Sequence, residues 1–339
     1  GVLVVLNSAA AHAKRPLRLR FRILTLAVEA GPLMSKLGAR LRRKLDVAPV
    51  AFDPWVPRVS QLLGGSSSAR KELFDALNFA AFYVHEIFRE AERVLYLDTD
   101  VVVLTDLIAD LATRDLDGKP AAAAEDCSQR MGKYVDLDRI KEKHIPAMIP
   151  LALKANKKAC VVNRGVVLIN TQQWASENIT QAIEALVRIH LSKKGPLWRA
   201  GVSQPPFLLA VAGRFHDLGA DYNVRGLGRG DIAPEEVTHY RQHKLWRPYF
   251  DRFLRKCEFH CCPGCKGWAM TPYISPNADR AKILHFNGRL KPHKTGRRGL
   301  VPVTEPRFGL SPQERMSREQ TPLCSCGPQC LQECAGLWW

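Results

Sequence analysis

The sequence predicts an α/β fold in which helices flank a largely parallel central sheet. Patterns typical of strands and of helices alternate along roughly the first 220 residues, as they do in α/β proteins. The 339 residues allow one large or two ordinary domains, at about 150 residues per domain. Hydrophobic residues make up 46% of the chain and charged residues 24%, a balance that excludes disordered, collagen-like and coiled-coil chains.

The first elements are expected in chain order as follows. Residues 3–13 have the pattern of a helix, and residues 18–28 alternate basic and apolar side chains as a strand does. Residues 46–68 contain three prolines and the sequence Gly-Gly-Ser-Ser-Ser, so a loose connection is expected there. Residues 72–88 have the periodicity of a long amphipathic helix.

Short, almost wholly apolar runs predict buried strands further along the chain. They cover residues 93–97, 121–124 and 166–169, and residues 172–191 then have the pattern of another helix. No apolar run approaches the roughly 20 residues that a membrane-spanning helix needs. Residue 1 is glycine and begins inside an apolar segment, so we expect the natural chain to start upstream.

The composition changes after about residue 220, where basic residues, proline, glycine and cysteine become more frequent. Two cysteine-dense segments suit either disulfides or zinc, and their spacing is not that of a standard pair of C-x₂-C motifs. The residues concerned are Cys257, His260, Cys261, Cys262 and Cys265 in the first segment and Cys324, Cys326, Cys330 and Cys334 in the second.

The sharpest local motif is Asp98-Thr99-Asp100, which follows the expected strand 93–97. Ligand crevices lie at the carboxyl ends of strands in α/β sheets. The two carboxylates are therefore candidates to hold a divalent cation that bridges a diphosphate, and the alternative is a solvated loop.

Two further motifs carry candidate ligands. His285 precedes Gly288 and Lys291; imidazole suits Mn²⁺, glycine allows close approach to a phosphate, and lysine adds a positive charge. Asn163 and Gly165 precede an apolar strand and suit contact with a sugar or ribose hydroxyl. The alternatives are a surface turn around His285 and a structural turn around Asn163.

Taken together, three blocks in one order resemble glycosyltransferase family 8. The blocks are RVLYLDTDVVV, NRGVVLINTQQW and ILHFNGRLKP, and the stretches QPPFLLAVAG and DYNVRGLG resemble the galacturonosyltransferase-like and the glycosyltransferase 8 domain-containing proteins. The resemblance covers roughly residues 1–293. It implies a GT-A, Rossmann-like fold over residues 1–296, with the first strand upstream of Gly1, a cysteine-rich insertion near residues 231–279, and a tail over residues 297–339.

The resemblance also implies roles for individual residues. The family's Mn²⁺ ligands are matched by Asp98, Asp100 and His285, and the turn that binds its diphosphate is matched by Gly288 and Lys291. Positions facing the ribose and the sugar are matched by Asn163 and Gly165. Asp126 matches an acidic residue that contacts the transferred sugar, and Gln204 matches a glutamine beside the anomeric carbon. A disulfide between Cys127 and Cys160 is implied as well, with two free thiols as the alternative.

The implied activity is retaining transfer of a hexosyl or uronosyl group from a UDP-sugar to a glycan hydroxyl, with Mn²⁺, in the Golgi lumen. The single sequon, at Asn178, agrees with a secretory route. Three positions depart from the family pattern: Ala81 stands where the family has arginine, Ser203 where it has aspartate, and His293 where it has tryptophan. Ala81 and Ser203 favour the alternative of an inactive relative that binds nucleotide sugars or glycans.

The charge balance points to a polyanionic partner. There are 50 Lys and Arg residues against 33 Asp and Glu, a formal net charge of +17. An acidic glycan acceptor or a membrane surface fits this charge, and a membrane anchor is expected upstream of Gly1. Specific nucleic-acid binding is not expected, because the basic residues are dispersed and no known module is recognisable.

Overall fold

The structure is a computed structural model that describes residues 1–64, 74–142, 156–192, 196–198, 201–227, 233–244 and 280–288. The chain divides into two compact units. The larger unit contains residues 9–97 and 105–219, and the smaller contains residues 1–8, 98–104 and those from 220 onward. The α/β class is confirmed, since strands and helices alternate in the described ranges.

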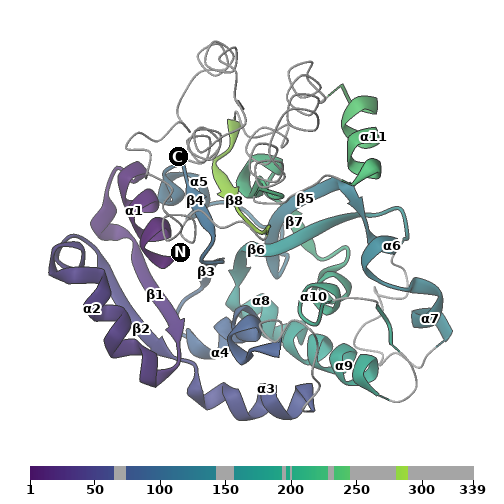
Figure 1. Ribbon diagram of the computed structural model, residues 1–339, viewed down its shortest axis with the longest axis horizontal. Helices are drawn as coiled ribbons and strands as arrows, with labels where there is room; N and C mark the ends of the chain where they lie inside the picture. The colour runs from purple at the N-terminus through teal and green to yellow at the C-terminus, as the bar shows by residue number, and fades with distance from the viewer. Residues whose placement is uncertain are drawn as a thin grey trace, which may run out of the picture. The chain divides into compact units, whose positions relative to one another are not determined.

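A four-stranded sheet forms the centre of the larger unit (Figure 1). Its order is β3 (Arg93–Leu97), β6 (Cys160–Asn170), β5 (Ala121–Arg130) and β7 (Phe215–Asp217). The strands expected over residues 93–97, 121–124 and 166–169 are therefore confirmed, two of them as parts of longer strands.

The sheet is mixed rather than mostly parallel, which corrects the expectation. β6 runs antiparallel to both β3 and β5, and only β5 and β7 are parallel. Continuous apolar runs are typical of parallel strands, because those strands are buried on both faces. Here Ala121–Ala124 and Val166–Ile169 are buried in an antiparallel pair, so the pattern reports burial and not strand direction.

The N-terminal part of the larger unit holds more regular structure than the sequence predicts. β1 (Arg20–Thr25) lies within the expected strand and pairs in parallel with β2 (Asp46–Ala51) across α2 (Ala27–Lys44). The loose connection expected over residues 46–68 is wrong for its described part, where β2 is followed by η2 (Asp53–Trp55) and α3 (Val56–Leu63). Prolines stand at the first helical positions of η2 and α3, where a missing N–H costs nothing.

The prediction of a long amphipathic helix over residues 72–88 is wrong about the type of helix. The described part is a 3₁₀-helix, η4 (Ala76–Tyr83), followed by one turn of α-helix, α4 (Val84–Ile87). Three residues per turn place side chains at i and i+3 above one another. Phe79 and Phe82 accordingly make an edge-to-face contact with ring centroids 5.7 Å apart, and five successive side chains of η4 are buried.

Helices α8 (Thr171–Ser176), α9 (Ile179–Leu191) and α10 (Gln204–Val211) pack together beside β6 (Figure 1). The expected helix 172–191 is interrupted at Asn178, which has a left-handed φ of 54°. The main hydrophobic core joins these helices to η4, α3 and the two central strands, with Trp174, Phe82 and Phe207 among its largest buried side chains.

The smaller unit is built on a two-stranded antiparallel sheet of β4 (Val101–Val103) and β8 (Ile283–His285). It also contains η6 (Ala220–Asn223) and α11 (Pro234–Gln242). The remaining elements of the described ranges are α1 (Val2–His12), which confirms the first expected helix, and η1 (Pro16–Arg18), α5 (Leu107–Leu111), α6 (Met131–Tyr134) and α7 (Leu137–Glu142).

Candidate metal centre and polar clusters

Two carboxylates and an imidazole meet in the smaller unit. Asp98, Asp100 and His285 each offer one ligand atom, and these three atoms all lie within 4.8 Å of one another. Nε2 of His285 is 3.2 Å from Oδ1 of Asp100 and 3.8 Å from Oδ2 of Asp98. The structure thus brings together residues 185 positions apart in the sequence, from Asp100 to His285.

Strand pairing produces this arrangement. β3 ends at Leu97, and β4 begins at Val101, directly after the Asp-Thr-Asp turn. Val101 pairs with His285 in the antiparallel β4–β8 ladder, and the N–H of Phe286 donates to the carbonyl oxygen of Asp100 at 2.9 Å. The backbone register therefore places the imidazole beside the second carboxylate.

The chemistry of this group of side chains fits a divalent cation. His285 is 1% exposed, and within the described part of the chain its Nε2 makes no hydrogen bond. Its Nδ1 lies 2.9 Å from Oδ1 of Asn223. Two carboxylates held close together repel each other, and a divalent cation would neutralise them while accepting the lone pair of Nε2.

The turn after β8 contains Gly288, expected at the diphosphate. Its N–H donates to the carbonyl oxygen of Leu227 at 3.0 Å, and Oδ1 of Asn287 accepts from the N–H of Gly226 at 2.9 Å. Both bonds hold the turn against residues 226–227. Lys291, expected at the same diphosphate, lies outside the described residues.

A polar cluster in the larger unit gathers the predicted Asn163, Gly165 and Gln204. Oδ1 of Asn163 accepts from the N–H of Gly165, two residues further along β6, at 2.9 Å. The carboxamide of Gln204, at the start of α10, bonds to the backbone of β6 at both ends. Its Oε1 accepts from the N–H of Arg164 at 3.2 Å, and its Nε2 donates to the carbonyl oxygen of Val162.

Arg164 is a member of this cluster that sequence reasoning missed. Its guanidinium donates to Oγ of Ser203 at 3.1 Å and to Oδ1 of Asn78, and Nδ2 of Asn78 donates to the same Ser203 hydroxyl at 3.2 Å. The available signal was an arginine between Asn163 and Gly165. Ser203, one of the departures from the family pattern, thus receives two hydrogen bonds, and Ala81, another departure, is buried in the core.

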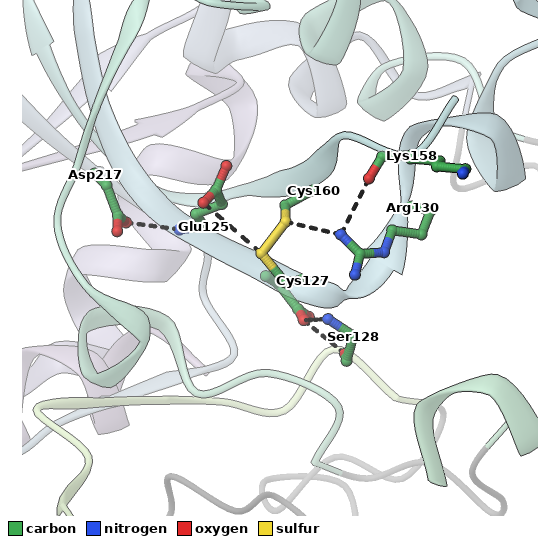
Figure 2. The surroundings of a disulfide bond; sticks show 8 residues. Glu125, Cys127, Ser128, Arg130, Lys158, Cys160 and Asp217 are labelled. Atoms are coloured by element: carbon green, nitrogen blue, oxygen red, sulfur yellow. Dashed lines mark hydrogen bonds between the residues drawn. A yellow bond between two sulfur atoms is a disulfide. The ribbon is translucent and has the colours of Figure 1, made fainter. Parts of the chain in front are cut away.

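Asp126 lies on β5, directly before Cys127. Its Oδ1 accepts from the N–H of Ser128 at 2.8 Å and from the Ser128 hydroxyl at 2.6 Å. The expected bond between Cys127 and Cys160 is present, with Cα atoms 4.4 Å apart. Figure 2 shows Glu125 on one side of this bond, and Arg130 donating to Sγ of Cys160 on the other.

Glu125 and Asp217 form an acidic pair that the sequence did not reveal. Oδ1 of Asp217 accepts from the N–H of Glu125 at 2.9 Å and from that of Gly219 at 3.0 Å. Burial raises the pKa of the Glu125 carboxyl, and the negative charge of Asp217 raises it further. Glu125 also lies close to the two cysteine sulfurs, which are bonded to each other and so are not metal ligands.

The two cysteine-dense segments, and with them the choice between zinc and disulfides, lie outside the described residues. His293 and the tail over residues 297–339 lie outside them as well.

Comparison with known proteins supports the resemblance. The profile of glycosyl transferase family 8 matches residues 1–295. Probable galacturonosyltransferase 5 of Arabidopsis thaliana is 27% identical over 292 residues, covering 83% of this chain and 45% of that protein. Glycosyltransferase 8 domain-containing protein 2 of Macaca fascicularis is 25% identical over 266 residues, covering 74% of this chain and 62% of that protein. The chain spans less than two thirds of the length of either relative.

Solved structures share the fold. The apo structure of the WbbM bifunctional glycosyltransferase matches with a TM-score of 0.50 and 18% sequence identity, covering 86% of this chain and 44% of that one. At this identity the likeness concerns the fold alone, and it confirms the expected GT-A class.

Proposed function

This chain belongs to glycosyltransferase family 8, and we propose that it is a retaining, Mn²⁺-dependent enzyme that transfers a hexosyl or uronosyl group from a UDP-sugar to a glycan hydroxyl. The observation that carries the proposal is the convergence of Asp98, Asp100 and the buried His285 on one point. The name of the Arabidopsis relative favours a uronosyl donor.

In the proposed reaction, the bond between the anomeric carbon and the diphosphate oxygen breaks, and a bond to the acceptor oxygen forms on the same face. The acceptor proton leaves with the diphosphate. Asp98, Asp100 and His285 would hold the cation, which when bound neutralises charge on the leaving diphosphate. The backbone at Gly288 and the charge of Lys291 would bind the same diphosphate.

Residues of the larger unit are assigned to the sugar and ribose. Asn163 and Gly165 would contact the ribose and the sugar, and Asp126 the transferred sugar. The amide oxygen of Gln204 has a second lone pair beyond the bond from Arg164, and this lone pair would stabilise positive charge at the anomeric carbon. Its hydrogen bonds to β6 would keep the carboxamide in one orientation.

The proposed setting is the lumen of the Golgi. The Cys127–Cys160 disulfide supports an oxidising compartment, since such bonds persist in secreted proteins and are rare in the cytosol. Within the described ranges, no helix combines the length and the apolar character required to cross a bilayer.

The direct test is release of UDP from a panel of UDP-sugars, with Mn²⁺ and after its removal by a chelator. We expect chelation, or any of Asp98→Asn, Asp100→Asn and His285→Gln, to lower turnover by about 100-fold or more, because several kcal/mol of charge stabilisation is lost. Asp221→Asn is the matched control, an acidic residue of the same unit outside the candidate site. Turnover that survives all three substitutions would contradict the assignment.

A second candidate is an inactive relative that binds nucleotide sugars or glycans. Ala81, which is buried and apolar, and Ser203, which binds Arg164 instead of offering a carboxylate, favour it. Calorimetric binding of UDP without turnover of any donor would support this candidate over the enzyme.

A further inference from the structure

Asn223 makes a buried contact with the imidazole of the candidate metal centre. Its Oδ1 lies 2.9 Å from Nδ1 of His285, and the two residues are 6% and 1% exposed. They come from different elements, since Asn223 ends η6 and His285 ends β8. Water is therefore excluded from the contact.

We propose that Asn223 is a positioning residue for the metal, whose amide oxygen holds the proton of His285 on Nδ1 so that Nε2 presents its lone pair to the cation. An amide oxygen can only accept a hydrogen bond, so Nδ1 must donate. A neutral imidazole carries one proton, so Nε2 is left as the acceptor on the side of Asp98 and Asp100. The inference rests on the proposed function, because it concerns the same cation.

The backbone around Asn223 fixes this contact. On one side, the N–H of Lys282 donates to the carbonyl oxygen of Asp221 at 2.8 Å. On the other, Val224 donates its N–H to Ile283 and accepts from the N–H of His285, both at 2.9 Å. Asn223 therefore lies between two anchored points, and its side chain is held at a set distance from the imidazole.

A positioning role of Asn223 differs from simple packing because it determines which nitrogen of His285 carries the proton. An imidazole with its proton on Nε2 would point an N–H at the carboxylates, and its lone pair would lie on Nδ1, facing Asn223 and not the cation. In the metal-free protein the nearby carboxylates favour that tautomer, because Nε2–H would then donate to Asp100. The hydrogen bond that Asn223 accepts from Nδ1 opposes this preference, so its loss is expected to change the tautomer and the metal affinity together.

The first measurement is Mn²⁺ binding to the whole protein, by titration calorimetry. Asn223→Ala is expected to weaken Mn²⁺ binding by about 10- to 100-fold, as outer-shell partners of metal-bound histidines do. Asn223→Asp keeps an oxygen acceptor and is expected to bind Mn²⁺ at least nearly as well as the native protein. Tyr222→Phe, which removes the neighbouring 2.8 Å bond from Lys282, is the matched control and should leave the affinity unchanged.

The second measurement is the ¹⁵N spectrum of the histidine rings in the metal-free protein, at a pH well above the ordinary pKa of histidine. His285→Gln identifies the His285 signals. The native protein should carry its proton on Nδ1, and Asn223→Ala should move it toward Nε2. This measurement needs neither metal nor turnover. If Asn223→Ala does not fold, the native spectrum alone shows which ring nitrogen of His285 carries the proton.

The outcomes separate the two proposals. If the native protein binds no Mn²⁺, the proposed function fails. The ¹⁵N spectrum then still tests whether Asn223 holds the proton of His285 on Nδ1. If His285→Gln abolishes Mn²⁺ binding but Asn223→Ala does not weaken it, the role of Asn223 fails while the metal site stands. A native His285 with its proton on Nε2 overturns the inference outright.

Discussion

At the scale of single residues, the polar cluster on β6 depends on side chains that bond to the backbone and to one another. Gln204 uses both ends of its carboxamide on β6, and Arg164 bridges β6 to Asn78 on η4 and to Ser203 before α10. A role for Gln204 beside the sugar could be expected from the resemblance. Its second role, in attaching α10 to β6, follows only from the three-dimensional contacts.

Replacing Gln204 with alanine tests that structural role. The carbonyl oxygen of Val162 and the N–H of Arg164 would lose their partners, so we expect the free energy of unfolding to fall by about 1–3 kcal/mol. Urea unfolding measures it. Gln173→Ala is the control, because the Gln173 carboxamide donates to the partly exposed Glu177 side chain and not to a backbone group of the described residues. Its cost should stay within about 0.5 kcal/mol. Equal stability of the two variants would show that the contacts of Gln204 contribute nothing.

At the scale of elements, the β5–β6 pair has an irregular register that the periodicity of the sequence did not predict. Its register shifts between the pairs Asp126–Val161 and Arg130–Cys160, which leaves residues 127–129 of β5 as a bulge. The disulfide crosses at this bulge, from Cys127 to Cys160. The hydrogen bonds from Ser128 to Asp126 lie within the bulge, so its shape controls the orientation of the Asp126 carboxylate.

Removing the disulfide should destabilise the larger unit. The bond spans 33 residues of sequence, and closing a loop of that length contributes about 3–4 kcal/mol through the entropy of the unfolded chain. The double variant Cys127→Ala with Cys160→Ala is expected to lose about that much free energy of unfolding in denaturant titrations. Mass spectrometry of unreduced peptides supplies the check on the premise: two alkylatable thiols at these positions would contradict the bond.

The elements also show where sequence patterns fail. Prolines suggested a loose connection over residues 46–68, yet Pro49 lies within β2, and Pro54 and Pro57 stand at helix starts where proline is tolerated. The periodicity of residues 72–88 predicted an α-helix, whereas the structure has a 3₁₀-helix over Ala76–Tyr83. The packing of Phe79 on Phe82 favours three residues per turn.

At the scale of the whole molecule, the net charge is +17, and the candidate site assigns a role to the charge of Lys291. Part of the excess lies in an exposed basic segment of the larger unit, formed by Lys14, Arg15 and Arg18. Arg20 and Arg22, next along the chain, instead face Asp46, at 3.9 and 2.8 Å. The Lys14 backbone N–H donates to the Asp106 carboxylate, so this segment also has a carboxylate neighbour. We propose that the basic segment attracts the acidic glycan acceptor that fits the charge of the chain.

Binding to polygalacturonate tests this proposal. Lys14→Glu, Arg15→Glu and Arg18→Glu combined are expected to weaken binding by about tenfold or more at low salt, with a smaller difference at high salt, where such attraction is screened. Affinity electrophoresis at several salt concentrations measures it. The control combines Lys36→Glu, Lys133→Glu and Lys158→Glu, which alters net charge equally at exposed but scattered positions. The same loss in both variants would mean that total charge, and not the basic segment, governs binding.

The sequence alone determined the α/β class, three of the central strands, the Asp-Thr-Asp turn after β3 and, through the order of its three blocks, the family. These features are local patterns or ordered motifs, so they can be found without coordinates. The resemblance to that family implied the pairing of Cys127 with Cys160, with free thiols as the alternative, and the structure contains the bond. The tertiary structure decided that the sheet is mixed, that Arg164 reaches Asn78 and Ser203, and that Asn223 meets His285. Such features depend on strand direction and register, which are set by hydrogen bonds between segments far apart in the chain, and no local pattern of residues records those bonds.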